Sequence, residues 1–170
     1  TNYFPGLIQL YCANLIESLK KKDYAGYAEA DTPPYILSET HVQKILGENE
    51  LQTEIKSKFF ITLTLDNDED NYYMLIALLV AYKYHEAKSS NIAAHEGCTP
   101  KDILKLANDF NVMRFRNFTE ENMYALMEEM KELNVFQAVG NNGYRFSRYN
   151  FLHMMGTEEE VINAIEQATL

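Results

Sequence analysis

The chain has 170 residues and a formal net charge of −10, from 15 lysines and arginines against 25 aspartates and glutamates. Hydrophobic residues make up 46% and charged residues 24%, which is typical of a globular protein and excludes the disordered, collagen-like and low-complexity classes. Because the chain has only 7 Gly and 4 Pro, its composition favours helices over an all-β fold. The length allows one domain of usual size or two small ones.

Residues 1–90 predict a helical bundle. Pro5 stands at a first-turn position, where its missing N–H costs nothing, and apolar residues at helical spacing follow as far as the lysines at 20–22. A polar loop comes next, and Ser38 is then expected to cap a short helix that Gly47 ends.

Two further helical stretches complete this bundle and flank an acidic cluster. Residues 48–65 are amphipathic, and residues 71–85 are apolar nearly all round, which is typical of a central core helix. The cluster at 66–70 lacks the glycine of a calcium loop, so we interpret it as favourable charge at the start of the next helix. The longest apolar run, 72–82, is about half of the roughly 20 residues that span a bilayer. The sequence therefore predicts no membrane segment.

The small and polar residues 88–97 are the best candidate for a hinge between the bundle and a second domain, 97–170. In that domain Thr99 and Pro100 are expected to begin a helix that runs to residue 110. After an irregular stretch, residues 119–133 form a longer helix, and its methionines and leucines recur as a buried stripe.

Two short strands are expected next, at 135–139 and 144–148. The Gly-Asn-Asn-Gly between them tolerates positive φ angles, which favours a hairpin. A brief turn or helix at 151–155 follows, and Thr157 with Glu160 forms a capping box for a last helix at 158–168. Helix, helix and hairpin in this order are typical of a winged helix-turn-helix. The predicted fold class is therefore mostly α, with a helical bundle followed by a winged helix that has a small β-hairpin.

No set of catalytic residues is recognisable. The chain has no phosphate-binding glycine loop, nucleophile elbow or zinc-protease motif, and His41, His85, His95 and His153 lie far apart without the spacing of metal ligands. We therefore predict no enzyme, no metal and no cofactor within these residues.

The two cysteines indicate a reducing, cytoplasmic compartment, and both are expected to be small buried or half-buried thiols. Cys98 precedes a helix N-terminus, which could lower its pKa. Because no base stands beside it, we interpret Cys98 as a packing residue.

Four tyrosines, Tyr72, Tyr73, Tyr82 and Tyr84, gather near one predicted helix. Such rings could form a stacking platform for bases or another ligand. We interpret them more plainly as residues that pack in the core and at a domain interface.

A winged helix often binds DNA, and the charge of its second helix tests that function. The outer face of the helix at 119–133 would carry Glu121, Glu128, Glu129 and Glu132 against a single base, Lys131. DNA phosphates repel such a face, so sequence-specific binding through this helix is not expected. Arg145 and Arg148 on the hairpin, with Arg114 and Arg116, leave backbone contact by the wing open.

Several stretches resemble a known family. They are residues 4–12 (FPGLIQLYC), residues 34–38 (PYILS) leading to His41 and Val42, residues 144–148 (YRFSR) and residues 155–160 (MGTEEE). They are similar to the region that follows the P-loop core in bacterial STAND/AAA+-type ATPases, which are related in layout to archaeal Orc-like ATPases. In that family a helix of the Pro-Gly-Leu-Ile-Gln type begins a helical lid, and a winged helix follows it.

The resemblance implies that the ATP- and Mg-binding segments lie in a domain upstream of Thr1, so that this part would not hydrolyse ATP. It implies that Pro5 and Gly6 lie near the nucleotide in the intact protein. The chain departs from the family in two respects. It has no arginine before Arg114 to sense a γ-phosphate from the lid, and its acidic outer helix differs from that of DNA-binding relatives.

These observations predict a non-catalytic, regulatory and protein-interaction part of a STAND-like ATPase. Its partners would be the upstream ATPase domain and either another protein or a second copy of itself. The alternative is a winged-helix transcriptional regulator that binds DNA, with its first half as a dimerisation or ligand-sensing bundle. A third interpretation is an adaptor between proteins with no ATPase attached.

Overall fold

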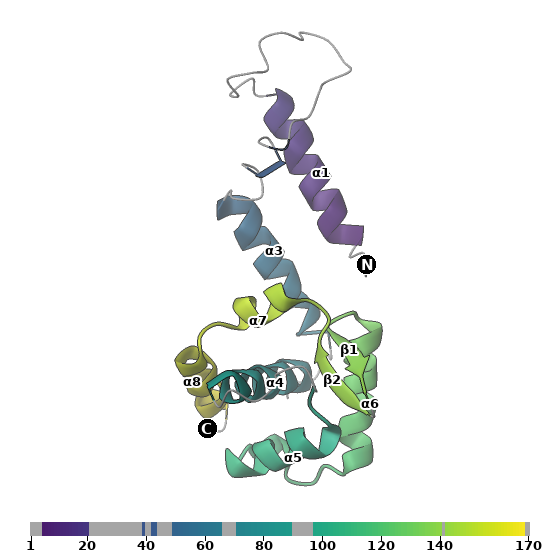
Figure 1. Ribbon diagram of the computed structural model, residues 1–170, viewed down its shortest axis with the longest axis vertical. Coiled ribbons are helices and arrows are strands. Elements are labelled where there is room, and N and C mark those ends of the chain that lie inside the picture. Colours follow the sequence, from purple (N-terminus) through teal and green to yellow (C-terminus); the bar gives the residue numbers. More distant parts are fainter. Residues whose placement is uncertain are drawn as a thin grey trace. The chain divides into compact units, whose positions relative to one another are not determined.

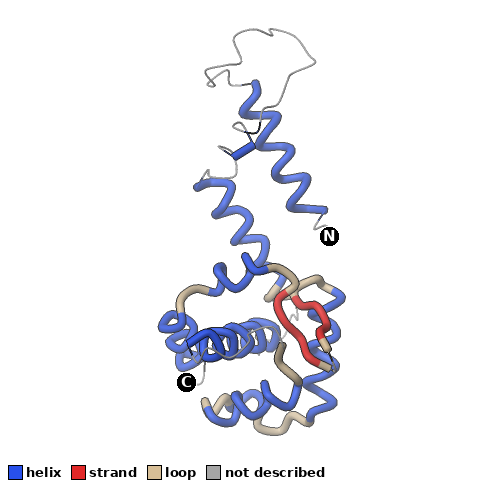
Figure 2. The backbone as a smooth tube through the Cα atoms, in the orientation of Figure 1, coloured by secondary structure: helices blue, strands red, loops and turns tan. Residues whose placement is uncertain are grey.

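The computed structural model describes residues 5–20, 39, 42–43, 49–65, 71–89, 97–140 and 142–168, and the statements below concern these residues. They are mostly helical, with one two-stranded antiparallel sheet (Figures 1 and 2). The expected mostly-α class with a small hairpin is thereby confirmed. The cap at Ser38, the acidic cluster at 66–70 and most of the expected hinge at 88–97 lie outside the described residues.

The chain divides into two compact units, Thr1–Lys58 and Phe59–Leu170. This division differs from the boundary expected at 88–97, which separated a bundle at 1–90 from a domain at 97–170. Helix α4 (Tyr72–Ser89) is the reason, because it belongs to the second unit. A helix that is apolar nearly all round must be covered on every side, and the elements that follow it in the chain provide that cover.

The first unit contains α1 (Pro5–Lys20) and most of α3 (Asn49–Thr62). Its described core consists of Leu10, Leu15 and Leu51. These leucines come from both helices, as expected for two amphipathic segments that bury one stripe each. Cys12 is an exposed free thiol, so the expectation that both cysteines are buried or half-buried is wrong for this residue.

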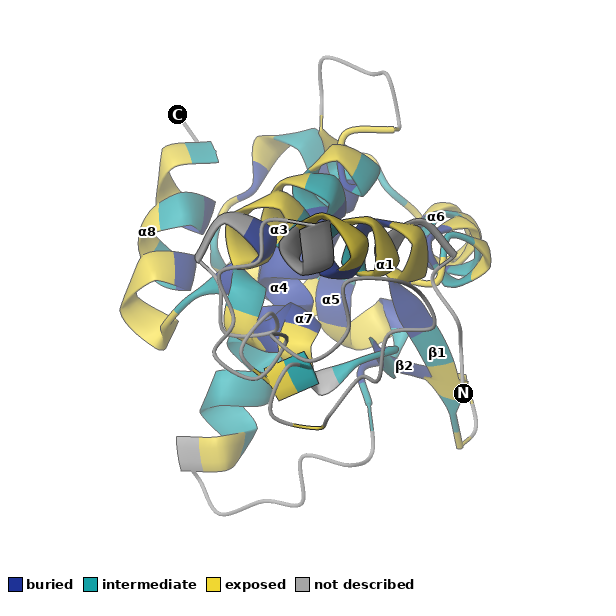
Figure 3. Ribbon diagram, turned by 90° about the horizontal axis from the view of Figure 1, so that it is seen from above, coloured by how far each residue is buried: buried dark blue, intermediate teal, exposed yellow. Residues whose placement is uncertain are grey.

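Helix α4 is the centre of the second unit. All seven residues from Leu75 to Ala81 are buried, which leaves no solvent-facing side along that stretch. Around it pack α5 (Pro100–Asp109), α6 (Glu120–Glu132), α7 (Tyr149–Met155) and α8 (Glu158–Ala168). In Figure 3, α8 has exposed residues along its outer side and buried residues towards α4. None of the described helices is both long enough and apolar enough to cross a membrane.

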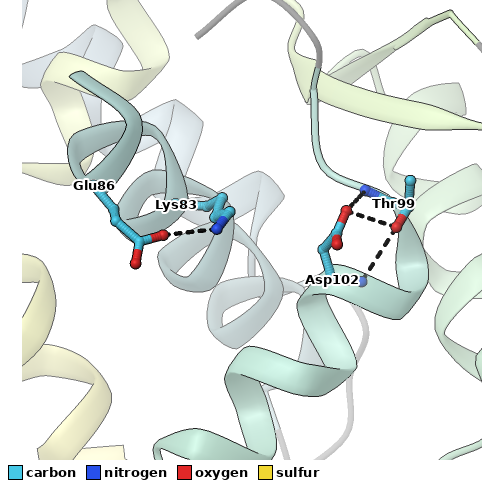
Figure 4. A network of polar contacts seen from close by, with 4 residues as sticks. All are labelled: Lys83, Glu86, Thr99 and Asp102. Atoms are coloured by element: carbon cyan, nitrogen blue, oxygen red, sulfur yellow. Dashed lines mark hydrogen bonds and ion pairs between the residues drawn. The ribbon is translucent and has the colours of Figure 1, made fainter. Parts of the chain in front are cut away.

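Local capping fixes where three helices of this unit begin. Thr99 and Asp102 form a capping box at the start of α5 (Figure 4), Thr119 and Asn122 form one at the start of α6, and Thr157 and Glu160 bond in the same way before α8. The caps expected at Thr99, Thr119 and Thr157 are therefore all present. Burial of Asp102 acts to raise its pKa, but the hydrogen bonds from Thr99 outweigh this effect and lower it.

The hairpin pairs β1 (Phe136–Val139) with β2 (Gly143–Phe146), and Gln137 lies opposite Arg145. Both strands are shorter than the expected 135–139 and 144–148. A single residue extends the sheet on the other edge of β2, where Cys98 and Tyr144 exchange two backbone hydrogen bonds of 2.7 and 2.9 Å. Gly97 permits this approach, since it has a φ of +73° and a Cβ there would lie 2.9 Å from the Tyr144 carbonyl oxygen.

The tyrosines of α4 pack as the plainer interpretation expected. Tyr72 lies against Phe115 and Phe118, which belong to the 3-10 helix η1 (Met113–Phe115) and the turn after it. Tyr82 meets Phe110 edge to face. These aromatic contacts join α4 to the segment between α5 and α6.

Candidate functional site

The outer face of α6 is acidic. Glu120, Glu121, Glu129 and Glu132 are exposed, and Glu128 is half-buried beside Lys131. On the opposite side of the helix Met123, Met127 and Met130 are completely buried. The sequence predicted this orientation, because the methionines recur at helical spacing and leave the carboxylates outside.

Two glutamates near the end of α6 are tied to tyrosines of other elements. The Tyr144 hydroxyl on β2 donates a hydrogen bond of 2.5 Å to Glu128 Oε1, and Lys131 forms an ion pair with Glu128 Oε2. The Tyr73 hydroxyl on α4 donates a hydrogen bond of 2.7 Å to Glu129 Oε2. These bonds fix the end of α6 against both the hairpin and the central helix.

The pKa values of this network follow from its geometry. The hydrogen bonds from Lys131 and Tyr144 lower the pKa of Glu128, since both stabilise its carboxylate form. Burial and the hydrogen bond to Glu128 raise the pKa of Tyr144. Glu128 therefore stays charged and Tyr144 stays protonated at neutral pH, so the bond between them persists.

A groove with a volume of about 600 Å³ opens at the other end of α6. Its walls come from the starts of two helices and from the hairpin turn: Thr99, Pro100, Lys101, Glu120, Glu121, Tyr124 and Asn142. The Tyr124 side chain is 46% exposed, and its ring stands edge-on to that of Tyr144 with 6.4 Å between the ring centres.

No motif or spacing in the sequence predicts this groove. The available signal was Tyr124, a large aromatic residue that falls outside the Met123–Met127–Met130 stripe. The sequence does not show that the start of α5 and the hairpin turn lie beside it.

The arginines proposed for nucleic-acid contact lie at separate places. Arg145 is half-buried on β2, and with its amide oxygen facing Arg145, Gln137 accepts hydrogen bonds from Nε at 2.7 Å and Nη2 at 3.0 Å. Arg148 is half-buried and stands at the N-cap of α7. Arg114 lies within η1, and Arg116 is exposed directly after it. Arg145 thus already has a partner on the hairpin.

The remaining candidates from the sequence are Cys98, the four histidines, and Pro5 with Gly6. Burial raises the pKa of the Cys98 thiol to about 12, which is opposite to the lowering that a helix N-terminus could produce. His85 Nε2 lies 3.2 Å from the carbonyl oxygen of Gly156, whereas His41 and His95 are outside the described residues. The described residues contain no group of three or more side chains suited to hold a metal ion. Pro5 and Gly6 are the first two residues of α1.

Comparison with protein-family models, with curated proteins and with solved structures gives no match to this chain. Among the described residues, the site consists of an acidic helix face and an open groove at one end of that helix.

Proposed function

We propose that this chain is the non-catalytic regulatory and protein-interaction part of a STAND-like ATPase. The observation that carries the proposal is the exposed acidic face of α6, which stands in a helix–helix–hairpin arrangement. Nucleotide binding would take place in a P-loop domain outside these residues, with ATP and Mg as its ligands.

The winged helix-turn-helix in this proposal comprises α4, α5, α6 and the hairpin. Its support is the order of these elements together with Cys98, which pairs with β2 between α4 and α5 and so acts as a minimal first strand. In this arrangement α6 corresponds to the recognition helix and the turn at 140–143 to the wing.

The charge of α6 favours a protein partner over DNA. A recognition helix that enters the major groove comes close to phosphates on both sides, and bound phosphates require lysine and arginine. Here four exposed glutamates occupy the outer face of the helix. The same charges suit a basic protein surface, because complementary charges steer association and fix its orientation.

The proposed mechanism is mechanical. The nucleotide state of the P-loop domain would bias the position of the lid-like first unit, in which Pro5 and Gly6 lie near the nucleotide. The winged helix would transmit that displacement to a partner protein or to a second copy of the chain. The nucleotide state would thereby control whether the outer face of α6 is exposed or is bound by the partner.

A nucleotide-dependent protease experiment tests this coupling. The longer protein with its P-loop domain is digested briefly with and without ATP, and cleavage within residues 88–97 is followed by mass spectrometry. We expect ATP to change the cleavage rate there. An unchanged rate, in a protein that binds ATP, would contradict the relay.

DNA binding by the hairpin is the alternative, and Arg145 and Arg148 are the residues that favour it. A mobility-shift assay of the chain on duplex DNA at low salt separates the two functions. We expect no firm complex. A firm complex that is lost on changing both arginines to alanine would instead favour a DNA-binding regulator.

A further inference from the structure

The groove between α5, α6 and the hairpin turn has carboxylates without partners. Glu120 and Glu121 are exposed, and neither forms a hydrogen bond or an ion pair with any described residue. Thr119 and Asn122 form the capping box of α6, so the side chains of Glu120 and Glu121 act at this helix start only as favourable charge in its first turn. Lys101 is the one cationic side chain among the groove residues, against two anionic ones. The charged side chains of the groove thus carry one more negative than positive charge, which complements a cationic ligand.

The groove also has an aromatic face that is held in place. Tyr124 follows Glu120 by four residues and Glu121 by three, so the three side chains share one side of α6. Behind Tyr124 stands Tyr144, which is 2% exposed and whose hydroxyl is bonded to Glu128. A ligand therefore meets an exposed ring that is already supported from within the fold.

We propose that this groove binds an arginine side chain from an extended segment of a partner protein. The guanidinium lies on the Tyr124 ring and donates hydrogen bonds to the carboxylates of Glu120 and Glu121. A guanidinium fits this set better than an ammonium, since it stacks on an aromatic face while its N–H groups reach carboxylates in the same plane. This inference rests on the proposed protein-interaction function and names the chemistry of the partner.

The test uses the whole 170-residue chain and a fluorescein-labelled hexapeptide of alternating arginine and glycine. Binding is measured by fluorescence anisotropy at about 0.15 M salt, where the field of distant charges is largely screened. Two control peptides carry lysine or citrulline in place of arginine. We expect the strongest binding for arginine, weaker binding for lysine, and none for citrulline, which keeps the shape but has no charge.

Three variants locate the binding. Tyr124→Ala is expected to weaken it about fivefold through loss of the ring, whereas Tyr124→Phe retains the ring and the affinity. Glu121→Gln should weaken it by a similar factor. The matched control is Glu132→Gln, which removes the same charge from the same helix outside the groove and should leave the affinity unchanged. Thermal melting followed by circular dichroism verifies that each variant is folded.

Equal weakening by Glu121→Gln and Glu132→Gln would overturn the proposal, because it would show a general attraction to a negatively charged chain. Binding of the citrulline peptide, or no binding of the arginine peptide, would also overturn it. Either result leaves the nucleotide-dependent relay intact, since that is measured by proteolysis of the longer protein. Firm DNA binding through Arg145 and Arg148 would instead contradict the proposed function.

Discussion

The two ends of α6 carry the same residue type in opposite circumstances. At the C-terminal end, which we call the supported end, Glu128 accepts a hydrogen bond from Tyr144 and Glu129 accepts one from Tyr73. These bonds hold the helix to the hairpin and to α4. At the N-terminal end, which we call the open end, the side chains of Glu120 and Glu121 form no hydrogen bond or ion pair with a described residue. Both are exposed and line the groove. Carboxylates of this helix therefore stabilise the fold at one end and are exposed to solvent at the other.

Tyr144 links the C-terminal end of α6 to other parts of the fold. This residue lies on β2, pairs through its backbone with Cys98, and stands behind Tyr124. The buried ring of Tyr144 therefore supports the exposed ring of Tyr124 in the groove. Changes at the two ends should therefore have very different effects.

The largest difference is expected in thiol reactivity, because Cys98 is buried where its backbone pairs with Tyr144, the residue that bonds to Glu128. At pH 8 a pKa of about 12 leaves a thiolate fraction on the order of a thousandfold below that of an ordinary cysteine. Cys12 is exposed and serves as the internal reference. A titration with a chromogenic disulfide reagent should give one fast thiol and one that reacts only in denaturant. In Cys12→Ser the fast phase should disappear, and a fast Cys98 would show that this region is open.

Truncation of the two neighbouring tyrosines, Tyr144 and Tyr124, should have unequal effects on the free energy of unfolding. Tyr144→Ala empties a buried site and removes the Glu128 hydrogen bond, at a cost of about 3–5 kcal/mol in the free energy of unfolding. Tyr124→Ala removes a half-exposed ring and should cost about 1 kcal/mol. Urea unfolding followed by circular dichroism measures both. Similar losses in the free energy of unfolding for the two variants would contradict the division of α6 into a supported and an open end.

Acid should lower the free energy of unfolding, and part of this loss should come from protonation of Glu128. Its pKa is lower in the folded chain than its ordinary value of 4.5, so the stabilisation is present above that value. It is lost as the pH falls through the lowered folded pKa. Glu128→Gln should therefore lose about 1 kcal/mol of stability at neutral pH and approach the parent chain in acid. Parallel stability curves of the two proteins between neutral pH and acid would contradict this assignment.

The smallest effect is expected at the open end. Glu121→Gln removes a charge from the first turn of α6, where negative charge is mildly favourable, and should change the stability by about 0.5 kcal/mol or less. The same urea measurement tests it, with Glu132→Gln as the comparison. A loss above about 2 kcal/mol would mean that Glu121 supports the fold and is not free to bind a partner.

Elements whose causes are local could be predicted from the order of the residues alone. Thr99, Thr119 and Thr157 each precede their capping partner by three residues, so the helix starts could be read directly. The methionine stripe of α6 and the Gly-Asn-Asn-Gly turn of the hairpin were equally visible. Each depends on the spacing of a few neighbouring residues, which is a property of the chain and not of its packing.

The contacts between distant residues could not be predicted in this way, because they arise when the elements pack together. The tertiary structure assigned α4 to the second unit, paired Cys98 with Tyr144, and brought the Tyr144 hydroxyl to Glu128. It also joined the starts of α5 and α6 to the hairpin turn as one groove. The apolar sequence of α4 predicts only that other elements cover this helix, and several combinations of helices and strands would do so equally well. The choice among them is made by the packing of the whole unit, because burial is non-directional and only complementary shapes fill the space.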